Sequence, residues 1–351
     1  MSIRHLGSIP SADRINYLNI GLMLVAVLVA VKVPFVLFLF AYAVLGPAHY
    51  LTEISWLHQR GYFTQRKYDY LLLGISALVV SLVVILMREP LWGEEGSKLA
   101  APGKVQMTAW IVAFCLAAAL AMVVKPTWLR MVCLLVVLVM AILSEPLVVL
   151  FAVFVPTLVH VYIFTGFFIL YGAMKGRNRS GYISFAIFLL CPFLFLLAPV
   201  SGFAPGQEVR ETYEQFWGLN VELFAIFKPD AFDARGLSDI AIFQSEFGVF
   251  IMRVIAFAYT YHYLNWFSKT SIIKWHQVSK PRMAVIAALW IGAVGIYAWD
   301  FVIGFKVLFV LSFLHVFLEF PLNHVTIIGV GRELKGMIFG GKTRSQPAAG
   351  R

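Results

Sequence analysis

Two stretches of the chain place the same pair of ionisable residues inside apolar surroundings. In GPAHYLTEISWLH, His49 is followed by Glu53, and in HVFLEFPLNH, His315 is followed by Glu319 and then by His324. Residues four apart on a helix lie on the same face, one turn from each other. Each stretch therefore predicts an imidazole and a carboxylate side by side on a helix.

Two more histidines lie in apolar runs, His160 in VPTLVHVYIFTGF and His262 in YTYHYLNWF. Ionisable groups inside a bilayer are energetically expensive and mark functional sites. Neutral imidazole and carboxylate are ligands of non-haem iron and similar metals. The sequence thus predicts a metal site with the ligands His49, His160, His262 and His315, and with His324 if Pro321 bends its helix. Glu53 and Glu319 are expected as the catalytic carboxylates, which orient imidazole N–H groups or bind the metal directly.

A simpler interpretation exists for each histidine taken alone. A single intramembrane histidine can serve as a hydrogen-bond partner between two helices. His58 and His276 lie near expected membrane surfaces, where an interfacial anchor is the simpler reading.

Aromatic side chains flank the candidate ligands. Packing and interfacial belts explain most of them. The sharper interpretation is a tunnel through which a long apolar substrate enters from the lipid. Its predicted lining residues are Tyr50, Tyr162, Tyr263 and Trp266.

The elements that must position these residues are transmembrane helices. The chain is 61% hydrophobic and only 13% charged, and its mean hydropathy is +0.84. A soluble protein of this length needs more polar surface, and a β-barrel would show alternating polarity. The sequence predicts an all-α, polytopic transmembrane bundle of about ten spans, at about 15–31, 34–57, 69–87, 106–124, 127–144, 147–172, 181–200, 247–267, 283–301 and 305–328.

We expect one integral membrane domain over residues 1–351. Within it, residues 201–246 form an extracytoplasmic loop or cap, and residues 340–351 form a disordered tail. Pro34 restricts the residue before it and cannot continue helical hydrogen bonding, so Lys32–Pro34 is predicted to be a tight turn rather than a kink with a buried lysine.

The distribution of charge predicts the orientation. Placing both termini in the cytoplasm puts most of the basic residues on the inner side, whereas acidic residues outnumber basic ones in the outer loop 201–246. We expect an integral protein of the bacterial inner (plasma) membrane. Contact with anionic membrane lipids explains the net charge of +10 without nucleic acid. The three cysteines lie in apolar segments without Cys-x-x-Cys spacing, which argues against a disulfide framework or a thiolate site.

The segment Gly46-Pro47-Ala48-His49-Tyr50-Leu51-Thr52-Glu53 resembles the first motif of the Brp/Blh family of membrane β-carotene 15,15'-dioxygenases, roughly Gly-x-Pro-His-Gly-x-x-Asp. Here the proline is shifted by one, tyrosine follows the histidine, and glutamate replaces aspartate. The segment YHYLNWFSKTSIIKWH and the helix of His315 are similar to later motifs. The resemblance implies a multi-pass helical protein that uses O2 and iron to cleave a carotenoid.

These observations lead us to expect a membrane-embedded oxygenase with a non-haem metal, iron in the first place. It would act with O2 on a lipid-soluble substrate that is carotenoid-like or another long apolar molecule. The alternative is a proton-coupled transporter that uses the histidines and glutamates as a relay. A structural or assembly factor, and a haem protein with two axial histidines, also remain open. Membrane desaturases and alkane hydroxylases fit less well because they depend on adjacent His-His pairs, and the chain has none.

Overall fold

The computed structural model describes residues 11–60, 150–200, 204–233 and 236–339, with scattered residues between 71 and 139. The span predicted at 106–124, most of those at 69–87 and 127–144, and the tail after residue 339 lie outside this part. Most of the described residues are helical, and among them the strands are limited to one short antiparallel pair, β1 (Phe232–Asp233) and β2 (Gly236–Leu237). The predicted all-helical fold class is confirmed.

In the part that the structure describes, seven helical segments are long and apolar enough to cross a membrane. Several of them combine consecutive helices. The segments are α1 (Ser11–Lys32); α2 (Pro34–Phe40) with the π-helix η1 (Ala41–Leu45) and α3 (Gly46–Arg60); the π-helix η2 (Leu150–Phe164) with α8 (Thr165–Gly176); α9 (Arg179–Leu194) with the 3₁₀ turn η3 (Phe195–Leu197); α13 (Glu246–Ser268); α15 (Lys280–Trp299); and α16 (Phe301–Ile338). The total of ten spans stays a prediction.

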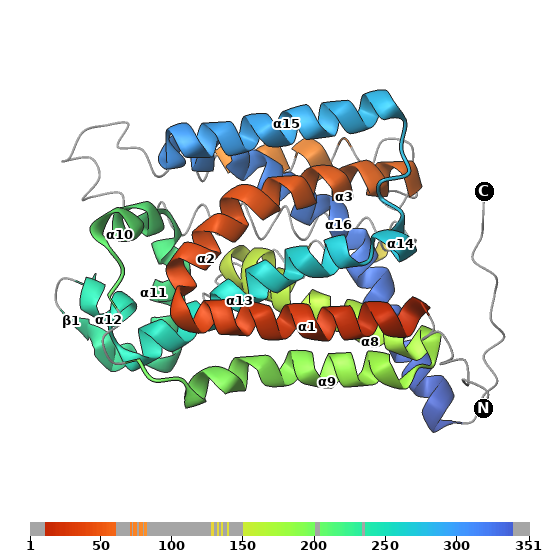
Figure 1. Ribbon diagram of the computed structural model, residues 1–351, viewed down its shortest axis with the longest axis horizontal. Helices are drawn as coiled ribbons and strands as arrows, with labels where there is room; N and C mark the ends of the chain where they lie inside the picture. The colour runs from red at the N-terminus through yellow and green to blue at the C-terminus, as the bar shows by residue number, and fades with distance from the viewer. Residues whose placement is uncertain are drawn as a thin grey trace, which may run out of the picture.

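The first two spans form a hairpin. Val33 leaves the helical conformation with φ of −140°, and Pro34 is the first residue of α2. The proline disfavours helical geometry in the residue before it, which ends α1 at the exposed Lys32. The predicted turn is confirmed, and α2 and α3 run back toward the end of the molecule where α1 begins (Figure 1).

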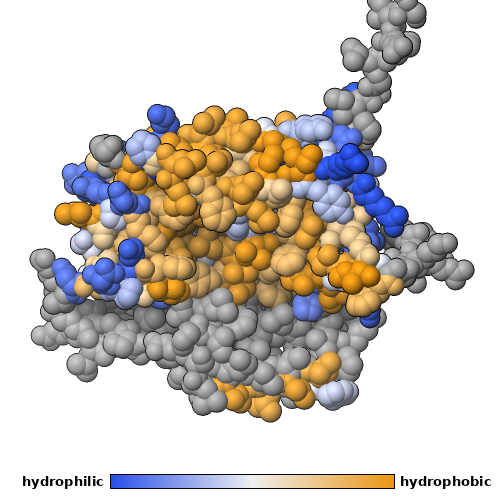
Figure 2. Space-filling model, turned by 90° about the horizontal axis from the view of Figure 1, so that it is seen from below, coloured by the Kyte–Doolittle hydropathy of each residue, from blue (hydrophilic) through white to orange (hydrophobic). Residues whose placement is uncertain are grey.

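The surface of the bundle suits lipid contact. Figure 2 shows an apolar face between hydrophilic residues at the two ends of the long axis. Large apolar side chains point outward from α1, α9 and α15, among them Leu28, Leu190 and Ile291. Helix α13 lies inside the bundle. In its most apolar stretch 78% of the residues are buried, whereas the corresponding fraction for α15 is 11%. The helix that carries His262 is therefore the central one.

The segment after α9 folds over the end of the bundle that lies away from the start of α1 (Figure 1). It contains short helices that pack on α2 through aromatic contacts, such as Phe38 with Phe216, whose ring centroids are 4.7 Å apart. Its helical elements are α10 (Gln207–Tyr213), η4 (Glu214–Phe216), α11 (Trp217–Phe227), η5 (Pro229–Ala231) and α12 (Asp239–Phe243).

A buried arginine closes two helix ends near this cap. Arg253 is 2% exposed and donates hydrogen bonds to the backbone oxygens of Val31, Ala198 and Pro199 at 2.8–3.2 Å. Carbonyl groups at the C-terminal end of a helix lack intrahelical partners and carry partial negative charge. Arg253 thereby ties α13 to the ends of α1 and of η3.

Substitution of Gly248 tests the contact between α12 and α13. A Cβ at Gly248 would meet the backbone oxygens of Ala241 and Ile242 closer than van der Waals contact, whereas nothing lies within 4 Å of a Cβ at Gly292. Overpacking costs about 1–3 kcal/mol, so Gly248→Ala should lower the midpoint of thermal unfolding in detergent. Gly292→Ala, the matched control, should leave it unchanged or raise it. Equal midpoints for the two variants would contradict this packing.

Candidate metal centre

The two His–Glu pairs from the sequence meet in space. Helices α3 and α16 pack against each other, and the Nε2 atom of His49 lies 3.0 Å from Glu53 Oε2. The Nε2 atom of His315 lies 3.8 Å from Glu319 Oε2 and 3.7 Å from Glu53 Oε2. Each glutamate thus faces the histidine of its own helix, and Glu53 also faces the histidine of the other helix.

The remaining two histidines complete the cluster from separate elements. His262 comes from α13, and its Nε2 atom is 3.1 Å from that of His49. His160 comes from η2, and its Nε2 atom is 3.1 Å from that of His315 and 3.3 Å from Glu319 Oε2. The four rings and both carboxylates are at most 6% exposed. The four predicted imidazole ligands and both predicted carboxylates therefore form one buried cluster.

The distances fit metal ligation. Two triads bring three ligand atoms within 4.8 Å of one another, namely His49, His262 and His315, and His160, His315 and Glu319. Bonds of about 2.0–2.1 Å from a metal to imidazole, at roughly tetrahedral or octahedral angles, place ligand nitrogens about 2.9–3.4 Å apart. The two 3.1 Å separations between Nε2 atoms fall in this range. His315 belongs to both triads, so the two triads form one connected set of ligands.

Hydrogen bonds on the far side of two rings favour this role. His315 Nδ1 lies 2.9 Å from the backbone oxygen of Ser312, which can only accept, so Nδ1 carries the proton and Nε2 keeps a lone pair. His262 Nδ1 lies 2.8 Å from the hydroxyl of Thr165. The carbonyl fixes the orientation and tautomer of His315, and the hydroxyl fixes the orientation of the His262 ring, as such partners do for metal-binding histidines.

Several polar atoms of the cluster make no hydrogen bond among the described residues, including Glu53 Oε2 and Glu319 Oε2, although imidazole nitrogens lie 3.0 and 3.3 Å from these two oxygens. A buried acceptor without a donor costs free energy, and two buried carboxylates that are both ionised repel each other. A cation between the Nε2 and Oε2 atoms satisfies the lone pairs and neutralises the charge. The donor set therefore fits a bound metal.

Local helix geometry helps to place the ligands. Short π-helical turns are often found at functional sites, and here the five-residue η1 directly precedes α3. His160 lies in the longer π-helix η2. The Trp290 indole donates to the backbone oxygen of Val44 in η1 at 2.9 Å. Gly46 leaves room for the Tyr50 ring, since a Cβ there would lie 3.0 Å from the Tyr50 hydroxyl oxygen.

Two of the predicted substrate-lining tyrosines close one side of the cluster. Tyr50 stacks on His315 with ring centroids 4.3 Å apart, and its hydroxyl lies 2.7 Å from that of Tyr263. Tyr263 contacts His49 at 5.2 Å between centroids. Both tyrosines are buried, at 3% and 1% exposure, so they shield the cluster from water.

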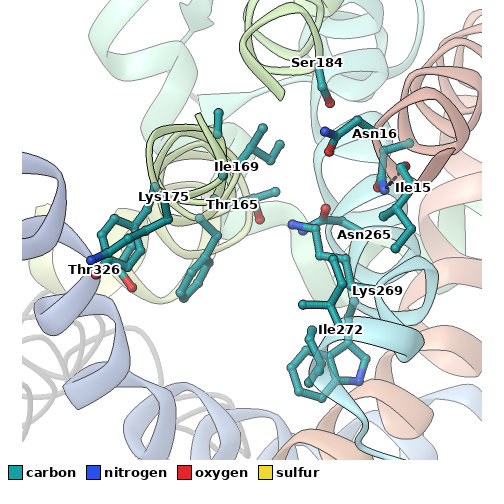
Figure 3. Close-up of a pocket in the computed structure, with 18 of the residues that line it drawn as sticks. Ile15, Asn16, Thr165, Ile169, Lys175, Ser184, Asn265, Lys269, Ile272 and Thr326 are labelled. Atoms are coloured by element: carbon teal, nitrogen blue, oxygen red, sulfur yellow. Dashed lines mark hydrogen bonds between the residues drawn. The ribbon is translucent and has the colours of Figure 1, made fainter. Parts of the chain in front are cut away.

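A cavity of about 510 Å³ reaches the cluster from the end of the bundle at which α1 begins. His49, Glu53, His262 and Glu319 line its deep part, and the predicted residue Trp266 forms part of its wall. In Figure 3, Asn265 and Lys269 lie on one side of the cavity, and Thr165 and Ile169 of α8 face them. The cavity gives a small molecule a route to the cluster.

Other candidate residues lie apart from the cluster. His324 is half-buried and belongs to neither triad. It follows His315 by nine residues on α16, which stays helical through Pro321, so the two side chains point to opposite faces. Tyr162 donates to the backbone oxygen of Phe188 at 3.2 Å and does not line the cavity. His58 and His276 are exposed.

Sequence reasoning missed several residues of the site. Thr165 and the carbonyl of Ser312 orient two imidazoles, and Asn265 and Lys269 line the cavity. One signal was present for the last two, because Asn265 and Lys269 follow His262 by three and seven residues and share its helix face.

The comparisons with known proteins identify no relative from which a function could be inferred. A scan against family models found no match, and searches of curated proteins and of solved structures found none at a significant level. The resemblance to the Brp/Blh family therefore remains an expectation from short motifs.

The geometry argues against a haem between these histidines. Two axial ligands of one haem lie on opposite faces of a macrocycle. The rings of His49 and His262 are in T-shaped contact with centroids 4.7 Å apart, and those of His160 and His315 are 4.8 Å apart. No porphyrin fits between rings in direct contact.

Replacing both carboxylates tests their part in holding a cation. Addition of Fe²⁺ should raise the unfolding midpoint of the wild type, because a metal that binds only the folded state stabilises it. The double variant Glu53→Gln/Glu319→Gln should lose most of this rise. Its midpoint without metal should not fall, because two buried acidic groups are removed. A metal-dependent rise of wild-type size in the double variant would show that the carboxylates do not bind the metal.

Proposed function

We propose that the protein is a membrane-embedded, metal-dependent oxygenase whose non-haem iron is held by His49, His160, His262 and His315. The observation that carries the proposal is the convergence of four Nε2 atoms from four elements, with both 3.1 Å contacts made through Nε2. If each histidine served only as a hydrogen-bond partner between two helices, the four imidazoles would not be expected to converge at one point together with two carboxylates.

The ligand types favour iron over the softer metals. All candidate ligands are nitrogen or carboxylate oxygen, and thiolate is absent from both triads. Such mixed sites with open positions are typical of non-haem iron oxygenases. The iron, when bound, supplies the binding and reduction of O2, and the protein supplies a buried pocket and a path for the second substrate.

The roles of the surrounding residues follow from their contacts. Thr165 and the Ser312 carbonyl hold two imidazoles with Nε2 directed inward. Tyr50 and Tyr263 exclude water from one side. Glu53 and Glu319, with Oε2 atoms 3.0 and 3.3 Å from imidazole nitrogens, bind the metal or hold protons at these oxygens.

The substrate of this proposal is a lipid-soluble molecule. Trp56, Phe168 and Trp266 give the cavity an apolar wall beside the cluster, and the volume of about 510 Å³ is in the usual range for small-molecule sites. The resemblance to carotenoid dioxygenases suggests carotenoid-like compounds as the first substrates to try.

Single histidine variants test the ligand assignment. His160→Ala and His315→Ala should each release most of the metal, because each removes an Nε2 ligand from a triad. Metal content is measured by plasma mass spectrometry on protein purified without chelators. His276→Ala and His324→Ala are the matched controls and should keep wild-type content. Undiminished metal in the first two variants would refute the ligand set.

Activity is tested with the intact protein. Expression in a bacterium that makes β-carotene should bleach the cells or accumulate retinal if the substrate is a carotenoid, and the His315→Ala variant should do neither. Consumption of O2 with other lipids extends the search if β-carotene is not cleaved. Proton-coupled transport by protein that contains no metal would instead support the relay and contradict the oxygenase.

A further inference from the structure

The cavity that leads to the cluster has chemically different ends. Its deep end holds His49, His262, Glu53 and Glu319, its middle is lined by apolar groups such as Phe168 and Ile169, and Lys269 lies toward the open end. A pure hydrocarbon in this cavity would offer no hydrogen-bond or ionic partner to the polar groups near the open end.

Asn265, one turn from His262 toward Lys269, has an amide oxygen without a partner in the described part of the chain. Asn265 is 7% exposed, and its Oδ1 atom has no hydrogen bond among the described residues. Its side chain points into the cavity in Figure 3. The neighbouring asparagines differ, because Asn16 donates to Ser180 and Asn19 accepts from Tyr261. Rotation of the amide lets Asn265 present a donor or an acceptor to a ligand.

Lys269 is the unpaired cation of this cavity. Lys175, the other lysine that lines it, forms an ion pair with Glu333 at 3.2 Å, whereas no acidic group pairs with Lys269 in the described part of the chain. Burial lowers the pKa of Lys269 to about 8. The ammonium therefore stays mostly protonated at pH 7, and an unpaired cation in a desolvated site attracts an anion.

We propose that the cavity binds a single-chain amphiphile with an anionic headgroup, such as a long-chain carboxylate, with the headgroup at Lys269 and Asn265 and the apolar chain directed toward the metal cluster. This inference rests on the proposed function only for what happens to the chain, and the binding itself needs no metal.

The helix geometry sets which part of the ligand meets the cluster. Lys269 caps the C-terminal end of α13 and follows His262 by seven residues, or two helical turns. Because a helix rises about 1.5 Å per residue, the two positions are about 10 Å apart along the helix axis. The chain passes along Trp266 and Phe168 over this distance. The middle of the chain, rather than the headgroup, is placed beside the cluster.

Photo-crosslinking tests the site. The probe is a palmitate analogue with a diazirine at mid-chain, added to the full chain in lipid nanodiscs without metal or oxygen, and the labelled residues are mapped by mass spectrometry. Labels should fall on cavity walls, such as Trp56 and Phe168. Palmitate should compete, and methyl palmitate and hexadecyltrimethylammonium should compete poorly because they lack the negative charge. Acetate should not compete, which separates an amphiphile site from a site for any small carboxylate.

Variants of Lys269 make the test specific. Lys269→Gln should weaken the competing affinity of palmitate about tenfold, and Lys269→Arg should restore most of it. Lys280→Gln, an exposed lysine at the start of α15, is the matched control and should bind as the wild type does. The midpoint of thermal unfolding of Lys269→Gln in detergent without added ligand should not fall below that of the wild type, which shows that the variant is folded.

Three results would overturn the inference. Labels confined to lipid-facing residues, equal competition by the methyl ester, or unchanged affinity in Lys269→Gln would each do so, even if the metal is bound. Conversely, the expected labelling in a protein that holds no iron would leave the amphiphile site standing and overturn the oxygenase.

Discussion

The structure depends on one constraint, the placement of four imidazoles and two carboxylates in the interior of a lipid-facing bundle. Such groups lose their hydration on burial, and unpaired charge there is strongly destabilising. Mutual contacts do not satisfy all of them, since both Oε2 atoms of the glutamates lack hydrogen bonds among the described residues. A cation at the centre resolves the conflict, because it pairs with the carboxylates and with the Nε2 lone pairs together.

The surrounding elements serve this centre. Helix α13 is buried along most of its length and carries His262 into the middle. Arg253 joins the N-terminal half of α13 to two helix ends, and the aromatic cap after α9 packs on α2, which leads through η1 into α3. Tyr50 and Tyr263 seal one side of the cluster, and the cavity opens on another. The result is a buried site that is reached from one end of the bundle.

The sequence was sufficient for the fold class and for the cluster, for a physical reason. Ionisable residues are rare in transmembrane helices, so His49, His160, His262 and His315 stood out, and the i, i+4 spacing placed each glutamate beside its histidine. The prediction of His324 as a further ligand was wrong, because it required a bend at Pro321, and α16 continues as a helix through this residue. The partners Thr165 and Ser312 could not be identified, because contacts between distant helices are set by packing and not by local periodicity. Asn265 and Lys269 were predictable in principle from the face they share with His262.

The most direct test of the central claim is X-ray absorption spectroscopy at the iron edge on the purified protein, after its iron content is established. A first shell of nitrogen and oxygen at about 2.0–2.2 Å, with the outer-shell scattering of several imidazoles and no sulfur, is the predicted result. Absence of iron above background after purification without chelators, or a spectrum dominated by sulfur or by a porphyrin, would contradict a non-haem iron centre at these histidines.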